Sequence, residues 1–428
     1  MRSEGVSNRK LRGLWIARQL PFPLDSGDKV YSAYLSRAVA DAGADLTMLG
    51  MAPEAPTNAP CDWPIHWVIV PGRPRSKLRS LCHVMPLVAA AHATVAYRSA
   101  VSRLLNEAWD FVVFDQYGMG WALAEFRKSS QKTGTAPVIV HVAHDHESSL
   151  SAALYRQFRG SWLKRIVLWQ NHLKTRALER KVALGSDLIA SITENDAALF
   201  AIDAPRSSIV VIKPGYCGTR SSRSVITQQV PRQVVMVGSF HWVAKQENLR
   251  QFIAVADPLF AQHGIEMHII GQVPERFATE IRRTVRATFM HGFVENIQSH
   301  FEQARIAIVP EAIGGGFKLK ILDYIFGGVP VATLTAAAAG LGPELRSAML
   351  CCNDIFSLAN SVCALMDDLN ELNRMRAEAL AKAESLFRWE DRGRAMIEAI
   401  MATRELTRLR GLARASDAIP APPSAHRS

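Results

Sequence analysis

The chain has 428 residues, of which 48% are hydrophobic and 21% are charged, a composition typical of globular proteins. A single hydrophobic core rarely grows beyond about 300 residues, so we expect two domains. The net charge of +11 indicates an anionic partner, but it does not choose between nucleic acid, membrane lipid and a phosphorylated substrate.

No run of about 20 apolar residues is present to span a bilayer, and residues 1–13 lack the apolar stretch of a secretory signal. We therefore expect a cytoplasmic protein. The cysteines are spread without C-x-x-C spacing, which argues against zinc and against a disulfide framework, and we expect free thiols. They are Cys61, Cys82, Cys217, Cys351, Cys352 and Cys363.

Short apolar runs alternate with longer helical stretches along the first half, which is typical of α/β units around a parallel sheet. A helix is predicted over 30–42, and the breaker sequence Lys213-Pro214-Gly215 predicts a domain boundary. The predicted strands are 14–17, 45–49, 65–70, 111–115, 138–142, 188–192 and 209–212.

The second half repeats the alternation and predicts a second doubly wound domain. A helix is predicted over 318–326, and the tail from 413 onward, rich in proline and small residues, is expected to be disordered. The predicted strands are 234–238, 267–271, 288–291, 306–309 and 329–333.

The segment GGGFKLKILD at 314–323 lies between a predicted strand and a predicted helix. Glycine lets the backbone come close to a ligand, and the free amides at a helix start favour phosphate. Lys318 and Lys320 add positive charge, and Asp323 can accept hydrogen bonds from ribose hydroxyls. The segment predicts a seat for a nucleotide diphosphate; a solvated helix face is the alternative interpretation of the lysines.

Gly27 lies in a loop between the first strand and the first helix, where open α/β sheets bind ligands. Asp25 or Ser26 beside it can also cap the helix, and the two interpretations are compatible. The G-x-G-x-x-G fingerprint is absent here, which counts against a dehydrogenase.

The run His144-Asp145-His146-Glu147 follows a predicted strand and is unusually polar for such a loop. His144 is a candidate site residue, although a lone histidine is more often structural. The run lacks the i, i+4 spacing of a helical ligand pair, so no metal is expected. Asp115, at the end of its own strand, is a lesser candidate for the same cleft.

Taken together, these segments resemble the two-domain glycosyltransferases of the GT-B fold, of the retaining family 4 type. The most specific part is IAIVPEAIGGGFKLKILDYIFGGVPVAT at 306–333, where the family closes on the donor nucleotide. The other matching segments are LPFPLDSGDKVYSAYLSRAVADAGADLTML at 20–49, HDHES at 144–148, VVMVGSFHWVAKQENLRQF at 234–252, HIIG at 268–271, HGFVENI at 291–297 and LFRWEDR at 386–392.

The resemblance implies two Rossmann-like domains facing across a cleft: an acceptor-side domain over 1–215 and a nucleotide-sugar domain over 216–388. A helix over 389–412 would return to the first domain, before a disordered tail over 413–428. The implied activity moves a sugar from a UDP- or GDP-sugar to a glycan or lipid-linked acceptor with retention, without metal or cofactor. Cell-surface polysaccharide or glycoconjugate synthesis is the implied setting.

The resemblance also assigns site residues. The implied catalytic residues are His144, Lys318 and Lys320. The implied donor residues are Gly27, Ser239, Glu295, Glu311, Gly314, Gly315, Gly316, Phe317, Leu319 and Asp323. The implied acceptor-side residues are Asp25, Asp115, His146 and Glu147.

The sequence departs from the family pattern at the donor site. Many members carry two glutamates eight positions apart, where this chain has Gly315 and Asp323. An arginine and lysine pair after the first strand of the second domain is replaced by Ser239 and Ala244. Lys318 is therefore the first choice for the diphosphate and Lys320 the second, while Glu311 is an alternative contact for the donor sugar.

Weaker candidates for the diphosphate are Lys245 and Arg250. These departures also keep two alternatives open: a non-catalytic GT-B partner that binds glycan or supports another transferase, and a nucleotide-sugar epimerase.

Residues 155–181 interleave basic and aromatic side chains. They predict either an amphipathic helix on an anionic membrane, peripheral at the inner face of the cytoplasmic membrane, or an ordinary helix whose apolar face packs inward. Nucleic-acid binding is not expected, because no reader motif accompanies the charge.

Overall fold

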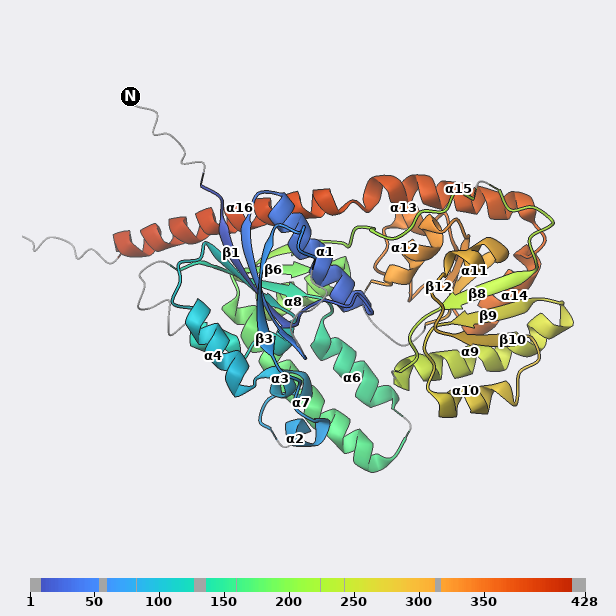
Figure 1. Cartoon of the computed structure of the whole chain (residues 1–428), viewed down its shortest axis with the longest axis horizontal. Helices are drawn as coiled ribbons and strands as arrows, with labels where there is room; N and C mark the ends of the chain where they lie inside the picture. Colours follow the sequence, from blue (N-terminus) through green and yellow to red (C-terminus); the bar gives the residue numbers. More distant parts are fainter. Residues whose placement is uncertain are drawn as a thin grey trace, which may run out of the picture.

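A computed structural model describes residues 9–53, 60–81, 83–126, 136–158, 160–223, 225–241, 243–311 and 317–417. These residues form two parallel β-sheets, each covered by helices (Figure 1). Within them, no helix is long and apolar enough to cross a membrane. Five of the predicted free thiols are free cysteines, while Cys82 lies outside the described residues.

The first sheet has the order β3-β2-β1-β4-β5-β6-β7, with every adjacent pair parallel. Its strands are β1 (Arg12–Gln19), β2 (Asp45–Ala52), β3 (Ile65–Pro71), β4 (Phe111–Asp115), β5 (Val138–Ala143), β6 (Leu188–Ser191) and β7 (Ser208–Val211). Its helices are α1 (Gly27–Asp41), α2 (Lys77–Leu81), α3 (Leu87–His92), α4 (Val95–Leu104), η1 (Tyr117–Met119), α6 (Glu147–Gln157), α7 (Trp162–Gly185) and α8 (Glu194–Asp203). Helix α1 begins three residues before the predicted start, because its first turn is polar and shows no apolar periodicity.

The second sheet repeats the winding in the order β10-β9-β8-β11-β12-β13. Its strands are β8 (Gln233–Val237), β9 (Glu266–Ile270), β10 (Thr288–Gly292), β11 (Ile306–Val309), β12 (Val331–Leu334) and β13 (Leu350–Cys352). Its helices are α9 (Val243–Gln262), α10 (Glu275–Arg282), α11 (Gln298–Gln303), α12 (Leu319–Phe326), α13 (Pro343–Arg346), α14 (Ile355–Leu365) and α15 (Leu369–Leu386). The prediction of two α/β domains is confirmed, and only the short β13 was missed.

The strand order reverses direction once in each sheet, between β1 and β4 and between β8 and β11. In open parallel sheets the loops on either side of such a reversal leave in opposite directions and open a crevice at the carboxyl ends of the strands. Asp115 ends β4 and Glu311 follows β11, so predicted site residues stand at both reversals.

Helix α16 (Trp389–Asp417) runs from the second domain back along the first and packs beside α1 (Figure 1). Met396 and Ile400 are buried in the core of the first domain, and the Trp389 ring stacks on Tyr34 with centroids 5.8 Å apart. Close approach needs a glycine, because a Cβ on Gly393 would lie 2.0 Å from the Ala38 carbonyl oxygen.

The prediction of disorder from residue 413 onward is wrong for its first residues. Residues 413–417 continue α16, because the alanine and arginine that dominate this stretch are strong helix formers. Residues 418–428 lie outside the described part of the chain.

Candidate functional site

A buried carboxylate and two lysines form the centre of the site in the second domain. Glu311 follows β11 and is 8% exposed, and Lys320 Nζ forms an ion pair with its Oε1. Lys318 Nζ lies 3.5 Å from its Oε2. Burial raises the pKa of Glu311, but the ammonium groups of Lys320 and Lys318 outweigh it and hold that pKa at about 2. Glu311 is thus ionised at neutral pH and turned inward toward the lysines.

Lys245 on α9 adds a third cation to this cluster. Burial lowers the pKa of Lys245, and the neighbouring ammonium groups of Lys320 and Lys318 lower it further, whereas Glu311 raises it. Glu311 and Asp28 raise the pKa of Lys245 and so partly balance the three ammonium groups. Clustered ammonium groups of this kind favour an anionic ligand.

Gly314, Gly315 and Gly316 lie outside the described residues. The elements that flank them are β11, which ends at Val309, and α12, which begins at Leu319, as the sequence predicted.

Phe317 and Leu319 stand where the two domains meet. Phe317 packs against both hydrophobic cores, and its ring centroid lies 5.7 Å from that of Phe387. Leu319 Cδ1 would lie 3.2 Å from a Cβ on Gly27, the first residue of α1. The glycine loop of the first domain therefore touches the start of the lysine-bearing helix.

Asp323 lies one turn further along α12. Burial raises the pKa of Asp323 to about 6, and no residue in the described part of the chain donates a hydrogen bond to its carboxylate. A half-buried acceptor without a protein donor is suited to accept hydrogen bonds from ligand hydroxyls.

In the first domain, Asp115 and His144 form a buried pair at the reversal. His144 Nε2 lies 2.8 Å from Asp115 Oδ1, and the indole of Trp15 donates to Asp115 Oδ2 over 2.9 Å. Burial raises the pKa of Asp115, but His144 and the surrounding hydrogen bonds lower it more, so the net shift is downward. Gln116 Nε2 lies 3.2 Å from His144 Nδ1. Both ring nitrogens of His144 thus have protein partners.

Gln116 was not recognised from the sequence. Its φ of 66° and ψ of 154° place it in a backbone region that is normally reserved for glycine and that costs about 1–3 kcal/mol. Strain of this kind persists where the surrounding structure enforces it, and here it aims the amide at His144. The available signal was its position directly after Asp115 at the end of β4.

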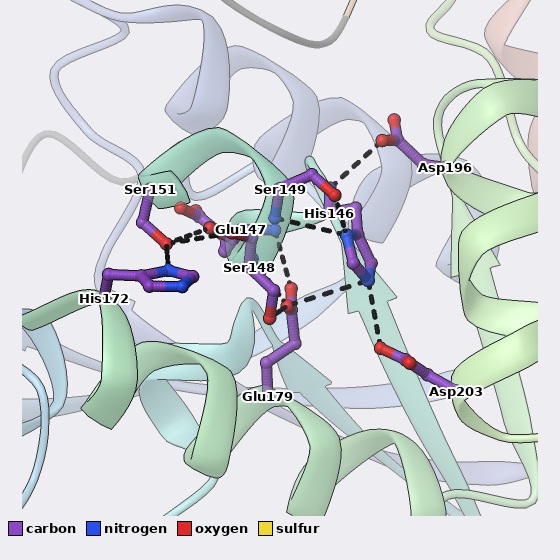
Figure 2. Close-up of polar contacts among 9 residues, drawn as sticks. All are labelled: His146, Glu147, Ser148, Ser149, Ser151, His172, Glu179, Asp196 and Asp203. Atoms are coloured by element: carbon purple, nitrogen blue, oxygen red, sulfur yellow. Dashed lines mark hydrogen bonds and ion pairs between the residues drawn. The ribbon is translucent and has the colours of Figure 1, made fainter. Parts of the chain in front are cut away.

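The side chain of His146 forms hydrogen bonds within the first domain, as Figure 2 shows. Its Nε2 lies 3.1 Å from Asp203 Oδ2 and its Nδ1 lies 2.8 Å from Ser149 Oγ. It occupies the N-cap position of α6 and is buried. These contacts engage both ring nitrogens of His146, so neither nitrogen is left to bind the sugar acceptor that the sequence predicted for it.

Glu179 on α7 anchors the start of α6 and was also missed. Its fully buried carboxylate accepts hydrogen bonds from the amides of Glu147 and Ser148, each over 2.7 Å, and from the Ser148 hydroxyl (Figure 2). No spacing rule links residues about 30 positions apart on different helices, so this contact could not be predicted from the sequence.

Two further carboxylates of the polar loop carry raised pKa values. Burial, followed by Asp145 and Glu179, raises the pKa of Glu147 to about 8. Burial and Asp196 raise the pKa of Asp145 to about 6, against the lowering effect of Lys318. Asp145 Oδ1 is buried without a hydrogen-bond partner among the described residues. Lys318 of the second domain thus acts on a carboxyl group of the first domain.

The remaining predicted site residues lie in loops and at a helix start. Asp25 forms an ion pair with Lys29 over 2.9 Å, and Ser26 holds the N-cap position of α1 without a capping hydrogen bond from its side chain. Ser239 is exposed in the loop after β8, and Glu295 is exposed after the edge strand β10.

Arg250 lies on α9. Its guanidinium is engaged by Glu247 and Glu280, each over 3.1 Å.

Comparison with known proteins gives the family context. Residues 231–368 match the family model described as glycosyl transferases group 1. No curated protein sequence matches the chain.

Solved structures show the same architecture over nearly the whole chain. HepE from Anabaena in complex with UDP and glucose has 13% identity and a TM-score of 0.62, covering 92% of this chain and all of that one. WaaG, a glycosyltransferase involved in lipopolysaccharide biosynthesis, has 14% identity and a TM-score of 0.62, covering 90% and 99%. An E. coli trehalose-6-phosphate protein bound with UDP-2-fluoro glucose has 13% identity and a TM-score of 0.62, covering 91% and 98%. The predicted GT-B fold is confirmed.

Proposed function

We propose that the chain, whose residues 231–368 match the model of glycosyl transferases group 1 and which has the GT-B fold, transfers a sugar from a nucleotide-diphosphate sugar to a glycan or lipid-linked acceptor. The second domain holds the donor, the first domain holds the acceptor, and the anomeric configuration is retained. The acceptor class implies a role in cell-surface polysaccharide or glycoconjugate synthesis.

The observation that carries the proposal is the lysine cluster around Glu311, with Asp323 one turn away on α12. In this proposal Lys318 and Lys320 bind the diphosphate of a donor whose ribose is held by Asp323. Sugar transfer expels a nucleoside diphosphate, so negative charge grows on its phosphate in the transition state. Fixed ammonium groups stabilise this charge, so the proposed reaction needs no metal ion.

Glu311 has a positioning role in this proposal. Its buried charge holds Lys318 and Lys320 together before the donor arrives. The donor phosphates then compete for the same ammonium groups. The donor sugar itself extends from the lysine cluster toward the first domain.

Glu147 is the proposed proton carrier on the acceptor side. A carboxyl group with a pKa of about 8 exchanges protons readily near neutral pH. The acceptor hydroxyl must lose its proton during transfer, and we assign this step to the Glu147 carboxyl group at the start of α6.

A donor screen tests the function. The protein is incubated with UDP- and GDP-sugars, with and without membrane glycolipid extract, and mass spectrometry follows donor loss and product formation. Transfer of one sugar supports the proposal. A changed nucleotide sugar without acceptor identifies an epimerase, and no turnover of any donor, together with a co-purifying transferase, identifies a non-catalytic partner.

Lysine variants test the site. Lys318→Ala is expected to lower kcat about 100-fold, the usual cost of removing one electrostatic contact to the transition state. Lys320→Ala also removes one of the two ion pairs of the buried Glu311 carboxylate. The double variant Lys320→Ala with Glu311→Gln removes that charge, and comparing the two separates the loss of Lys320 from the effect of a buried, less well paired carboxylate. Lys382→Ala, which removes a surface ion pair with Glu378, is the control. Unchanged turnover in Lys318→Ala would refute the assignment.

Helix α7 supports a membrane-bound acceptor. Trp162, Ile166, Trp169 and Leu173 recur at helical spacing and are 43–69% exposed, and the exposed Lys164 and Arg165 lie beside them. The exposure of these apolar side chains supports the membrane-surface interpretation of residues 155–181. Apolar side chains flanked by cations bind anionic bilayers through insertion and charge. We therefore propose that the protein lies at the inner face of the cytoplasmic membrane.

Vesicle flotation tests this placement. The double variant Trp162→Ser and Trp169→Ser is expected to reduce the fraction bound to phosphatidylglycerol vesicles at least tenfold, with little binding to phosphatidylcholine by either protein. Phe356→Ser, which removes a 66% exposed aromatic ring from the second domain, is the control. Equal flotation of both variants would exclude α7 as the membrane contact.

A further inference from the structure

Three imidazoles gather in the second domain, apart from the residues assigned to sugar transfer. His268 lies on β9, His291 on β10 and His300 on α11. Each offers a ring nitrogen, and these atoms all lie within 4.8 Å of one another. The shortest separation joins His268 Nδ1 and His291 Nε2, at 2.9 Å.

The strand pairing explains how His291 reaches this position. Strands β9 and β10 are parallel neighbours in register up to Met290, and the register then shifts before Gly292. His291 is the extra residue at this irregularity, and Gly292 follows with a φ of 72°. A bulge of this type turns a side chain away from the regular alternation, here toward His268.

A carboxylate orients the central imidazole. Glu266 Oε2 lies 3.1 Å from His268 Nε2, and the same oxygen accepts a hydrogen bond from Gln233 Nε2 over 3.2 Å. With Nε2–H donated to Glu266, the lone pair of His268 sits on Nδ1, which faces His291. Metal-binding histidines commonly have this arrangement, in which a carboxylate holds the far ring nitrogen.

We propose that His268, His291 and His300 bind a divalent transition-metal ion, with Zn²⁺ as the best match. Zinc binds imidazole nitrogen at about 2.1 Å, which requires nitrogen pairs about 3–4 Å apart. The shortest pair, at 2.9 Å, is close to this separation, and all three nitrogens lie within 4.8 Å of one another, so metal binding requires only small side-chain rotations. Imidazole ligands suit Zn²⁺, Ni²⁺ and Cu²⁺, and exclude a hard ion such as Mg²⁺.

The bound ion cross-links three elements at the edge of the second sheet: β9, the edge strand β10 and α11. Water completes its coordination. Its role is to stabilise this edge, so the site operates whether or not the proposed sugar transfer takes place.

Metal titration of the full chain tests the site. Untagged protein is freed of metal with a chelator and titrated with Zn²⁺ by calorimetry and with Co²⁺ by absorption spectroscopy. One equivalent with a Kd below about 10 µM and a rise in Tm are expected, and visible Co²⁺ bands would show nitrogen ligation. Absence of saturable binding overturns the proposal.

Variants distinguish this site from other surface histidines. His291→Ala and His300→Ala are each expected to weaken Zn²⁺ binding more than 100-fold, while the exposed His263→Ala, on the same domain, leaves it unchanged. Glu266→Gln is expected to weaken binding about 10- to 100-fold through the orientation of His268. Circular dichroism confirms folding of each variant. If Zn²⁺ binds all variants equally, the three histidines are not its ligands.

Discussion

Asp323 is a half-buried carboxyl group that accepts no hydrogen bond from the described part of the chain. Burial raises the pKa of Asp323 above its usual 3.8 to about 6, so the folded state prefers the protonated form. The associated stabilisation is fully present below pH 3.8 and is lost as the pH rises through about 6. At pH 8 the carboxylate therefore lowers stability, and a bound ribose would supply the missing hydrogen-bond donors.

We expect Asp323→Asn to be more stable than the wild type at pH 8, by about 1 kcal/mol, and to bind UDP or GDP about tenfold more weakly, because a hydrogen bond to a charged acceptor is lost. Urea unfolding at pH 5 and pH 8 and calorimetric titration of nucleotide measure the two effects. Asp62→Asn, at an exposed position, should change neither. A loss of stability together with unchanged affinity would give Asp323 a structural role instead.

The pKa of Glu147 is also raised, so its contribution to stability also falls with rising pH, but at a higher pH than for Asp323. Because its folded pKa is about 8, the stabilisation from the protonated form is lost as the pH rises through 8. Glu147→Gln keeps a neutral group at this position, so its stability relative to wild type should increase between pH 6 and pH 9. Thermal unfolding across this range checks the trend, and a flat difference would mean that Glu147 ionises normally.

At the scale of single elements, helix α6 depends on a residue from its neighbour. Glu179 supplies the acceptors for the first amides of α6, and it is fully buried by α6, α7 and the polar loop. Helix starts otherwise rely on a cap close in sequence.

Glu179→Ala should therefore lower the free energy of unfolding by about 3 kcal/mol, because two amides and a hydroxyl lose their buried acceptor. It should also lower activity, since the start of α6 carries Glu147. Urea unfolding measures the change, with the exposed neighbour Arg180→Ala as the control. A cost below 1 kcal/mol would show that water replaces the carboxylate.

The contrast between α12 and α6 shows what the sequence could predict. The strands and α12 follow from apolar runs and periodicity, since buried parallel strands leave a continuous hydrophobic signal. Asp115, Glu311 and Lys320 could be named as candidates because they stand at strand ends or on a helix start. Gln116, Glu179 and the role of His146 depend on contacts between distant segments. The outward direction of α7 also needed the structure, because periodicity shows an apolar face but not what covers it.

For the whole molecule, α16 is the element that joins the domains. Trp389 leads from α15 into α16, and Gly393 lets α16 approach the backbone of α1. The backbones of α16 and α1 thus approach each other as closely as packed helices within one domain.

We expect Gly393→Leu to push α16 away from Ala38 and to cost about 3 kcal/mol through overpacking. Calorimetry should then resolve two unfolding transitions, because the helix no longer couples the domains. Gly342→Leu is the matched control, since a Cβ there meets nothing within 4 Å. A single unshifted transition would show that α16 is not the coupling element.

The return of α16 also sets an order of events during synthesis on the ribosome. Met396 and Ile400 complete the core of the first domain, but residues 212–388 must be translated before they emerge. Domains generally fold as they leave the ribosome, starting from the N-terminus. Here the apolar side chains that Met396 and Ile400 cover stay exposed in the nascent first domain until the second domain has been made. A ribosome that stalls between the domains therefore releases a first domain with an incomplete core.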